Sequence, residues 1–270
     1  MKYQGVYFMK KTLIALAVAA SAAVSGSAMA WTASGLGGSV DLGGTLKPVD
    51  VITPWEVKVG AAVNDLNAEI RKGDTEAYIP VKNAIPVLGI RVADATWKAF
   101  WGQLGIAPNI DYHGAINVND FSRGEVPLTL DVKNTQDQKI GSLTVNLSAG
   151  AEYARYNPST DKGEKYVLYQ NSKGELFFGG LGTNRDAVSP YSWTLANTLD
   201  PEFVANYNDF GVGQLSNPYY GDVGNTKLNY SAFYASGVVQ GKTIKLTLEQ
   251  PAASDAIAWK ASLPITVSYQ

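Results

Sequence analysis

The sequence predicts an all-β fold, an antiparallel β-sandwich in one large domain. Short runs of alternating apolar and polar residues recur along the chain, and turn-forming residues separate them. The chain has 270 residues and no cysteine, so its stability must come from a large core or from a partner rather than from disulfides. Many short alternating strands of this kind are typical of a sandwich.

Residues 1–30 have the features of a secretion signal. Lys10-Lys11 forms a basic region, residues 12–24 are apolar or small, and Ala28-Met29-Ala30 is an A-x-A cleavage site. The apolar run is too short, and too rich in alanine and serine, for a membrane-spanning helix. Met9 is an alternative translation start. We therefore expect export through the periplasm.

Residues 31–47 form an N-terminal extension that predicts a donor strand. From residue 36 on, apolar or glycine positions alternate with polar or glycine positions. Glycine weakens a strand and marks close backbone approach, so this strand needs support from another element. Insertion into a groove on another molecule fits this pattern; the alternative is an edge strand of the chain's own sheet. The face that would enter the groove consists of Leu36, Gly38, Val40, Leu42, Gly44 and Leu46.

Residues 48–270 form the main domain. Clear period-2 alternation predicts strands at 55–59, 128–133, 140–147, 243–249 and 263–269. Residues 183–229 are rich in turn-forming residues and predict a loop-rich insert.

Three short helical inserts are also expected. In the first, Val63, Leu66 and Ile70 share one helical face. The second covers residues 94–104, where apolar side chains recur at helical spacing. The third begins at Asp200-Pro201, because aspartate is a good N-cap and proline fits the first helical position.

The last predicted strand runs to Gln270 and carries a regular apolar face. A plain core strand is one interpretation. An apolar strand that ends in a free carboxylate can also be captured by a partner that pairs with its edge and binds the terminus. The groove-edge and anchor candidates are Leu263, Ile265, Val267, Tyr269 and Gln270.

Several short motifs, in order along nearly the whole chain, resemble those of the FaeG-like branch of chaperone–usher fimbrial subunits. Each is weak alone, and their order and spacing carry the resemblance. They are Asp41-Leu42-Gly43-Gly44, Trp55-Glu56-Val57-Lys58-Val59-Gly60, Asp111-Tyr112-His113-Gly114-Ala115, Lys133-Asn134 with Lys139-Ile140-Gly141-Ser142, Gly174-Glu175-Leu176-Phe177, Gly241-Lys242-Thr243-Ile244, and the ending 259–269.

The resemblance implies an immunoglobulin-like sandwich that lacks its last strand. A periplasmic chaperone would supply a strand to the open groove, and at the outer-membrane usher the N-terminal segment of the next subunit would replace it. The carboxylate of Gln270 would anchor to the chaperone. The resemblance further implies a surface fimbrium that acts in cell adhesion, neighbouring subunits as partners, and host glycoconjugates as ligands in this branch.

Aromatic residues gather in the second half of the chain and suggest a glycan-binding surface. Aromatic faces stack on sugar rings, and phenol hydroxyls bond sugar hydroxyls. The alternative is that β-proteins use tyrosine in strands and turns anyway, which would leave a minor structural subunit. The candidates are Tyr153, Tyr156, Tyr191, Trp193, Tyr219 and Tyr220.

The sequence gives little support to catalysis, a metal site or a cofactor. His113 is the single histidine, and without cysteine a structural zinc site is not expected. Asp161, Glu164, Glu175 and Asp186 could pair for glycoside hydrolysis, but polar turns carry such residues by default. No phosphate-binding or dinucleotide fingerprint occurs. The net charge of −2, without a polybasic patch, argues against nucleic acid. We expect no enzyme; a secreted carbohydrate-active enzyme on a β-sandwich is the alternative.

Overall fold

The computed structural model describes residues 42–47 and 52–270, and the chain divides into two units, Met1–Val49 and Asp50–Gln270. In the first unit, residues 42–47 have no regular secondary structure. In the second, the strands are β1 (Trp55–Val59), β2 (Glu76–Pro80), β3 (Ile85–Val92), β4 (Phe100–Trp101), β5 (Pro108–Asp111), β6 (Glu125–Lys133), β7 (Lys139–Asn157), β8 (Lys162–Leu168), β9 (Ser216–Tyr219), β10 (Asn229–Val238), β11 (Thr243–Leu248), β12 (Lys260–Ala261) and β13 (Thr266–Tyr269).

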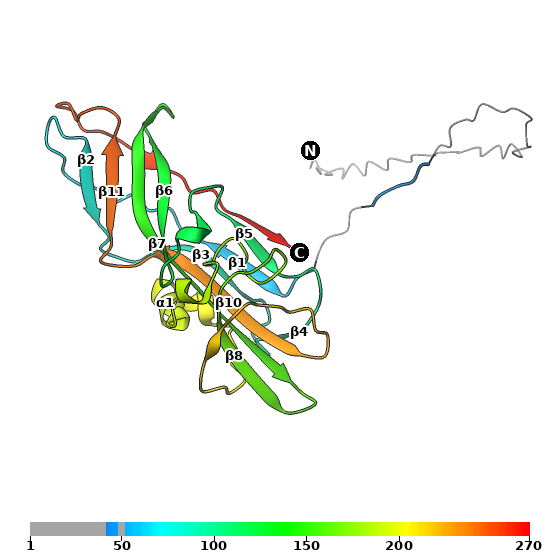
Figure 1. The fold of residues 1–270 in the computed structure, drawn as a ribbon. Coiled ribbons are helices and arrows are strands. Elements are labelled where there is room, and N and C mark those ends of the chain that lie inside the picture. The colour runs from blue at the N-terminus through cyan, green and yellow to red at the C-terminus, as the bar shows by residue number, and fades with distance from the viewer. Residues whose placement is uncertain (1–41, 48–51) are drawn as a thin grey trace, which may run out of the picture. The chain divides into compact units, whose positions relative to one another are not determined.

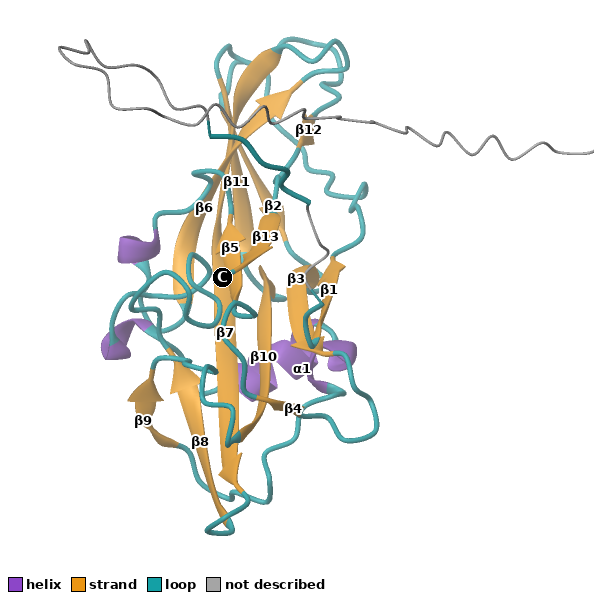
Figure 2. Ribbon diagram, turned by 90° about the vertical axis from the view of Figure 1, so that its right-hand side faces the viewer, coloured by secondary structure: helices purple, strands orange, loops and turns teal. Residues whose placement is uncertain are grey.

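Helices are few and short. They are α1 (Ser192–Leu199) and three 3₁₀ turns, η1 (Val118–Asp120), η2 (Arg185–Ala187) and η3 (Pro201–Val204). None of the helices in the described ranges is long and apolar enough to cross a membrane. The all-β, sandwich-like fold class predicted from the sequence is confirmed (Figures 1 and 2).

The 19-residue strand β7 organises the large sheet. Its first half pairs with β6 and β11, and its second half pairs with β10 and β8. The sheet order is β1-β3-β10-β7-β11-β2, and β5 and β13 form a separate two-stranded sheet. All strand pairs are antiparallel except β8 with β9. The long central strand is visible in Figure 2.

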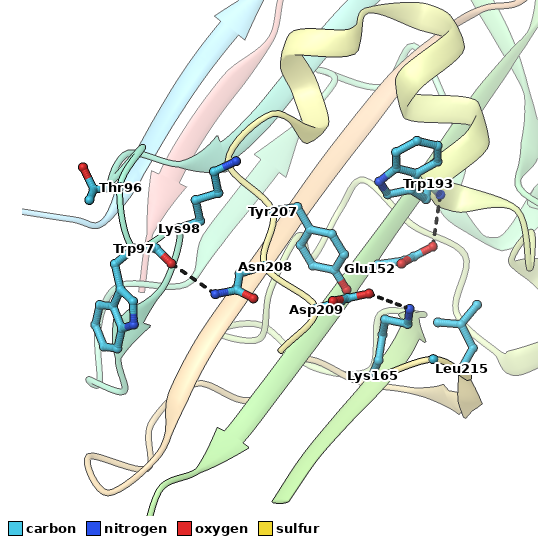
Figure 3. Close-up of a pocket in the computed structure, with 11 residues that line it drawn as sticks. Thr96, Trp97, Lys98, Glu152, Lys165, Trp193, Tyr207, Asn208, Asp209 and Leu215 are labelled. Carbon is cyan, nitrogen blue, oxygen red and sulfur yellow. Dashed lines mark hydrogen bonds and ion pairs between the residues drawn. The ribbon is translucent and has the colours of Figure 1, made fainter. Parts of the chain in front are cut away.

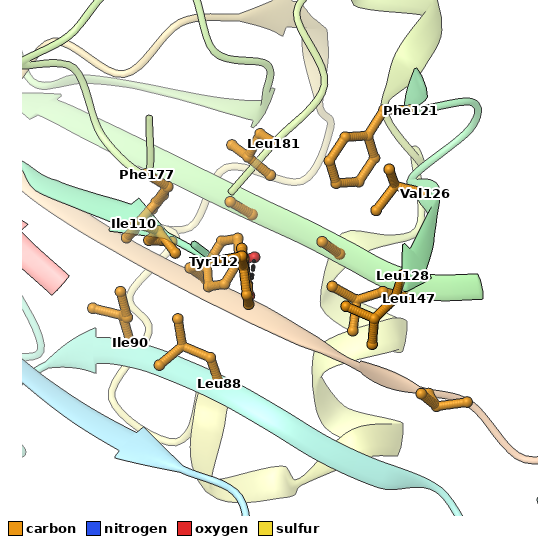
Figure 4. Close-up of a cluster of buried hydrophobic side chains, with 14 of the residues drawn as sticks. Leu88, Ile90, Ile110, Tyr112, Phe121, Val126, Leu128, Leu147, Phe177 and Leu181 are labelled. Atoms are coloured by element: carbon orange, nitrogen blue, oxygen red, sulfur yellow. Dashed lines mark hydrogen bonds between the residues drawn. The ribbon is translucent and has the colours of Figure 1, made fainter. Parts of the chain in front are cut away.

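The main core lies between the large sheet and the two-stranded sheet. Leu88 and Ile90 of β3 are fully buried, and Ile110 of β5 packs in the same cluster. Figure 4 shows these side chains together with Tyr112. The Tyr112 hydroxyl lies 2.9 Å from the Tyr234 hydroxyl and 2.7 Å from Ser236 Oγ, so the polar groups inside this core are satisfied by one another.

A second, smaller core lies on the opposite face of β10. Phe233 and Ala235 of β10 pack there against Leu199 of α1 and Phe203 of η3, while Tyr234, next to them in sequence, faces the main core. This two-sided cover explains why all ten residues of β10 are buried. The helical part of the 183–229 insert therefore covers the face of the sheet that is opposite the main core.

The predicted strands at 55–59, 128–133, 140–147 and 243–249 are confirmed within β1, β6, β7 and β11. The fifth, at 263–269, is confirmed for residues 266–269. In β6, the first half of β7 and β11, strand prediction succeeds because one face of the run is buried and the other is more exposed.

Two of the three helix predictions are wrong. Residues 61–71 have no helix, and Leu66 and Ile70 pack half-buried on the core instead, so tertiary packing overrides helical spacing. In 94–104 the Asp94 carboxylate accepts the amides of Thr96 and Trp97, both at 2.8 Å, and closes a turn. The left-handed φ of Lys98, 57°, then ends any helix.

The third helix prediction holds in part. Asp200 caps η3 by accepting the Glu202 amide at 2.9 Å, with Pro201 behind it as expected. The element is a single 3₁₀ turn rather than an α-helix. The α-helix directly before it, α1, was not predicted.

Gly89 allows η3 to approach the sheet, which gives a direct test of the second core. A Cβ at Gly89 would lie 2.1 Å from Phe203 Cδ1, and Phe203 is buried and cannot swing away. We expect Gly89→Ala to destabilise the fold by about 2 kcal/mol through overpacking, measured by urea unfolding. Gly213→Ala is the matched control, since nothing lies within 4 Å of its Cβ position. Equal stability of the two variants would contradict this packing.

Candidate functional site

Past Trp55, the inner face of β1 is left uncovered beside buried side chains of β3. In the antiparallel pair with β3, Val57 lies opposite Ile90 and Val59 opposite Leu88, so each pair shares one face of the sheet. Ile90 and Leu88 are 0% exposed, whereas Val57 is 40% and Val59 60% exposed. Beyond the buried Trp55, the core therefore ends at β3.

The C-terminal segment is half-buried in the same way. From residue 259 to 270 every second side chain is partly buried and the others are exposed. The partly buried side chains, including the predicted Leu263, Ile265, Val267 and Tyr269, pack against the main core, but none is fully covered. β13 pairs with β5 along one edge, and within the described residues no strand pairs with its other edge.

The start of β1 and the end of the chain meet at Ile106 and Ala107. The Trp55 indole Nε1 donates to the Ile106 carbonyl at 2.7 Å. Ala107 exchanges two backbone hydrogen bonds with Gln270, at 3.1 and 3.2 Å. The start of β1 thus lies near the end of the C-terminal segment. We call the incompletely covered apolar side chains of β1 and of this segment the open face: Val57, Val59, Leu263, Ile265, Val267 and Tyr269.

The predicted donor residues are only partly within the described chain. Leu36, Gly38 and Val40 lie outside the described residues. Leu42, Gly44 and Leu46 lie in the irregular stretch 42–47, where Leu42 is 93% and Leu46 97% exposed. These two leucines are available to a partner.

The aromatic candidates do not form one platform. Tyr153 is only 1% exposed, and its hydroxyl donates to the Asp222 carbonyl, so it cannot stack on a sugar and this prediction is wrong. Tyr219 and Tyr220 stack on each other with ring centroids 4.2 Å apart. Alternation along β7 turns Tyr153 into the core, which the residue type alone did not reveal.

The remaining candidates lie at two further places. Tyr156 stacks on Phe210 at 5.5 Å. Tyr191 and Trp193 stand at the start of α1, 72% and 45% exposed. Of the six candidates, only Trp193 lines the cavity beside α1.

This cavity has a volume of about 710 Å³ and lies between α1, β7, β8 and the loops near residues 97 and 208 (Figure 3). Two tryptophans line it, Trp97 and Trp193. Lys165 Nζ pairs with Asp209 Oδ2 at 3.3 Å on its wall. Two aromatic side chains with a few fixed polar groups are typical of a small-ligand pocket.

Glu152 and Tyr207 are the buried polar groups of this cavity. Glu152 Oε1 accepts the Trp193 amide at 3.1 Å. The Tyr207 hydroxyl oxygen is buried and has no hydrogen-bond partner in the described ranges. Burial raises the pKa of Glu152, although the Trp193 amide and Lys165 oppose this. Burial, and then the charge of Glu152, raises the pKa of Tyr207 well above its ordinary value.

Sequence analysis missed most of this cavity. Trp97 was assigned to a helix, and Glu152, Lys165, Tyr207 and Asp209 come from strands and loops far apart in sequence. The one local signal was the dense polar and aromatic stretch 206–209 after η3.

His113 contacts neighbours that invite a catalytic interpretation, which the geometry does not support. Its Nε2 lies 2.8 Å from Thr266 Oγ1, and its Nδ1 lies 4.0 Å from Asp111 Oδ2, beyond hydrogen-bonding distance. The side chains of His113 and Asp111 are 45% and 66% exposed. Since Thr266 pairs with Asp111 across β13 and β5, this contact ties the last strand to its neighbour.

Within the described residues, no three histidine, cysteine or acidic side chains are grouped so that they could hold a metal ion. Three of the four acidic candidates for hydrolysis have structural partners: Asp161 accepts the Tyr156 hydroxyl, Glu164 pairs with Arg155, and Glu175 accepts the Ser172 amide.

The fold is an all-β sandwich whose last strand is incompletely covered, and an N-terminal extension with regular apolar positions precedes it. This is the architecture expected of a fimbrial subunit. Residues 9–270 match the family model described as "Fimbrial, major and minor subunit", so the chain belongs to this K88 fimbrial family. The resemblance seen in the sequence is confirmed.

Individual relatives agree over nearly the full length. K88 fimbrial protein AB of Escherichia coli is 31% identical, and K88 fimbrial protein AC of the same organism is 32% identical. The F41 fimbrial protein of Escherichia coli is also 32% identical. Each alignment covers 97% of this chain and 100% of the relative. These relatives are fimbrial proteins, which implies a place in a cell-surface fimbrium and assembly with other fimbrial subunits.

Proposed function

We propose that this chain is an adhesive fimbrial subunit that polymerises by donor-strand exchange through the chaperone–usher pathway. The segment 31–47 of one copy covers the open face of the next. The observation that carries the proposal is the contrast within one strand pair: Ile90 and Leu88 are fully buried, while Val57 and Val59 beside them are not.

The energetics favour such an exchange. Burial of Leu36, Val40, Leu42 and Leu46 would contribute about 1.5–3 kcal/mol each before entropy costs. The free edge of β13 offers backbone groups for main-chain hydrogen bonds. An inserted strand would therefore satisfy both the apolar face and the edge.

The same open face explains why a chaperone and an usher are expected partners. An uncovered edge strand above an exposed core pairs with other chains and aggregates. A periplasmic chaperone that lends a strand would protect the face and hold the Gln270 terminus, and the outer-membrane usher would be the place of exchange. Export by the predicted signal in residues 1–30 belongs to this proposal.

Two variants test the donor and the acceptor separately. Leu42→Asp places a charge on the donor, and Val59→Asp places one on the open face, where a 60% exposed side chain leaves folding unaffected. We expect each variant alone to stay bound to its chaperone and form no polymer, measured by detergent-resistant multimers. Mixed together they should form dimers and nothing longer, because only one donor and one acceptor remain intact.

Tyr78→Asp is the control for the acceptor variant, since Tyr78 is 57% exposed on β2, away from the open face. It should polymerise normally. Normal polymers from either Leu42→Asp or Val59→Asp would contradict the assignment of donor or acceptor.

We further propose that the cavity at α1 binds host glycans and gives the fimbria its adhesive function. The support is that Trp97 and Trp193 both line the cavity, where an aromatic face can stack on a sugar ring. Glu152, Tyr207 and Lys165 add hydrogen-bonding groups to the same lining. Its volume of about 710 Å³ suits a small oligosaccharide. The two acids that line the cavity already have structural partners, since Asp209 pairs with Lys165 and Glu152 accepts the Trp193 amide.

Trp193→Ala should weaken binding of fimbriae to a glycan array by roughly 30-fold, since about 2 kcal/mol of apolar contact is lost. Tyr191→Ala is the matched control: it stands at the same end of α1, more exposed, and does not line the cavity. If Tyr191→Ala lost binding and Trp193→Ala kept it, the glycan site would be an open surface and not this cavity.

A further inference from the structure

The carboxylate of Glu152 reaches α1 from a different element. Glu152 lies in β7 between Phe233 of β10 and Val167 of β8, and its Oε1 accepts the Trp193 amide at 3.1 Å. The helix has no cap of its own, because the side chain of Tyr191 at the N-cap makes no capping hydrogen bond. Glu152 therefore supplies, from the sheet, the acceptor that a helix start needs.

The negative charge at this position has a cost. Glu152 is 4% exposed, and burial raises the pKa of its carboxyl group. When the pKa of an acid is higher in the folded than in the unfolded state, the folded protein loses stability as the pH rises from the unfolded-state pKa through the folded-state pKa. The reason is that the buried group must then carry its charge. A glutamine oxygen could accept the same amide without this cost. A charge kept at the expense of stability points to a function.

Charged and polar groups surround Glu152 from every side. Lys165 faces it from β8 and is shared with Asp209, while Tyr207 faces it from the loop after η3. Lys98 lines the cavity from the loop before β4. Figure 3 shows Glu152 between Trp193 and Tyr207. The described part of α1 carries no ionisable side chain, so it presents only backbone amides to the carboxylate.

We propose that Glu152 is a positioning residue of the cavity: its ionised carboxylate holds the first turn of α1, and thereby Trp193, in the binding position, so that capture weakens in acid. A carboxylate at a helix N-terminus is favoured by the partial positive charge of the amides there. Protonation removes that attraction and leaves an ordinary hydrogen bond. The proposal rests on the glycan-binding function proposed above for the same cavity.

The first test follows the helix itself and needs no ligand. In fimbriae purified from cells that express the full chain, hydrogen exchange of the α1 amides is measured from neutral to acid pH and corrected for intrinsic rates. We expect protection of the Trp193 amide to fall by about fivefold in acid, the ratio that ~1 kcal/mol of charge–dipole attraction gives. In Glu152→Gln the profile should be flat. The same profile in both proteins would overturn the proposal.

The second test follows binding to a glycan array. Wild-type capture should fall about fivefold over the same pH range, and Glu152→Gln should bind at the acid level throughout while melting no lower than wild type at pH 7. Glu152→Asp keeps the charge but is too short to reach the amide, so it should bind weakly at every pH. Full capture by Glu152→Asp or pH-dependent capture by Glu152→Gln would overturn the positioning role.

The two tests fail in different ways. If wild-type fimbriae bind no glycan at any pH while the exchange profile behaves as expected, the glycan function is wrong and the hold of Glu152 on α1 stands. If glycans bind and the exchange profile is flat in wild type, the cavity binds sugar without positioning by the Glu152 carboxylate, and the proposal is wrong.

Discussion

The structure depends on one requirement, that the apolar faces of its strands are covered. The described chain leaves one such surface uncovered, the open face on β1 and the C-terminal segment. Leu88 and Ile90 of β3 are buried, yet Val57 and Val59 of β1 beside them are exposed, and the C-terminal segment is only half-buried. Covering this open face would complete the core, and the chain itself carries a matching apolar segment at its start. A polymer follows if the segment covers a neighbour instead of its own domain.

The rest of the sandwich has stabilising contacts away from the open face. The hydroxyl groups of Tyr112, Tyr234 and Ser236 satisfy one another inside the main core. The helical insert closes the opposite face of β10 with its own small core, where Phe203 rests on Gly89. Because this second core shares no side chain with the open face, the insert can carry the cavity at α1 without interfering with strand exchange.

The strands could be predicted from the sequence because burial on one face gives an unambiguous period of two, as in 128–133 and 243–249. Of the helices, only the start of η3 at Asp200-Pro201 could be predicted. Leu66 and Ile70 have helical spacing but pack on the sandwich core, and the turn at Asp94 depends on one side-chain cap and the left-handed Lys98. Residue type placed Tyr153 at a surface, while its position on β7 buries it. The cavity joins Glu152, Lys165 and Asp209 from separate elements, which only the three-dimensional fold reveals.

The central claim is that the sandwich is incomplete and the N-terminal segment completes it. The most direct measurement compares the melting temperature of residues 47–270 alone with that of the same chain carrying residues 34–46 after Gln270 through a short flexible linker. The account predicts a soluble monomer with a much higher melting temperature for the grafted chain. A stable ungrafted chain whose melting temperature the graft leaves unchanged would mean that the sandwich is already complete, and would contradict it.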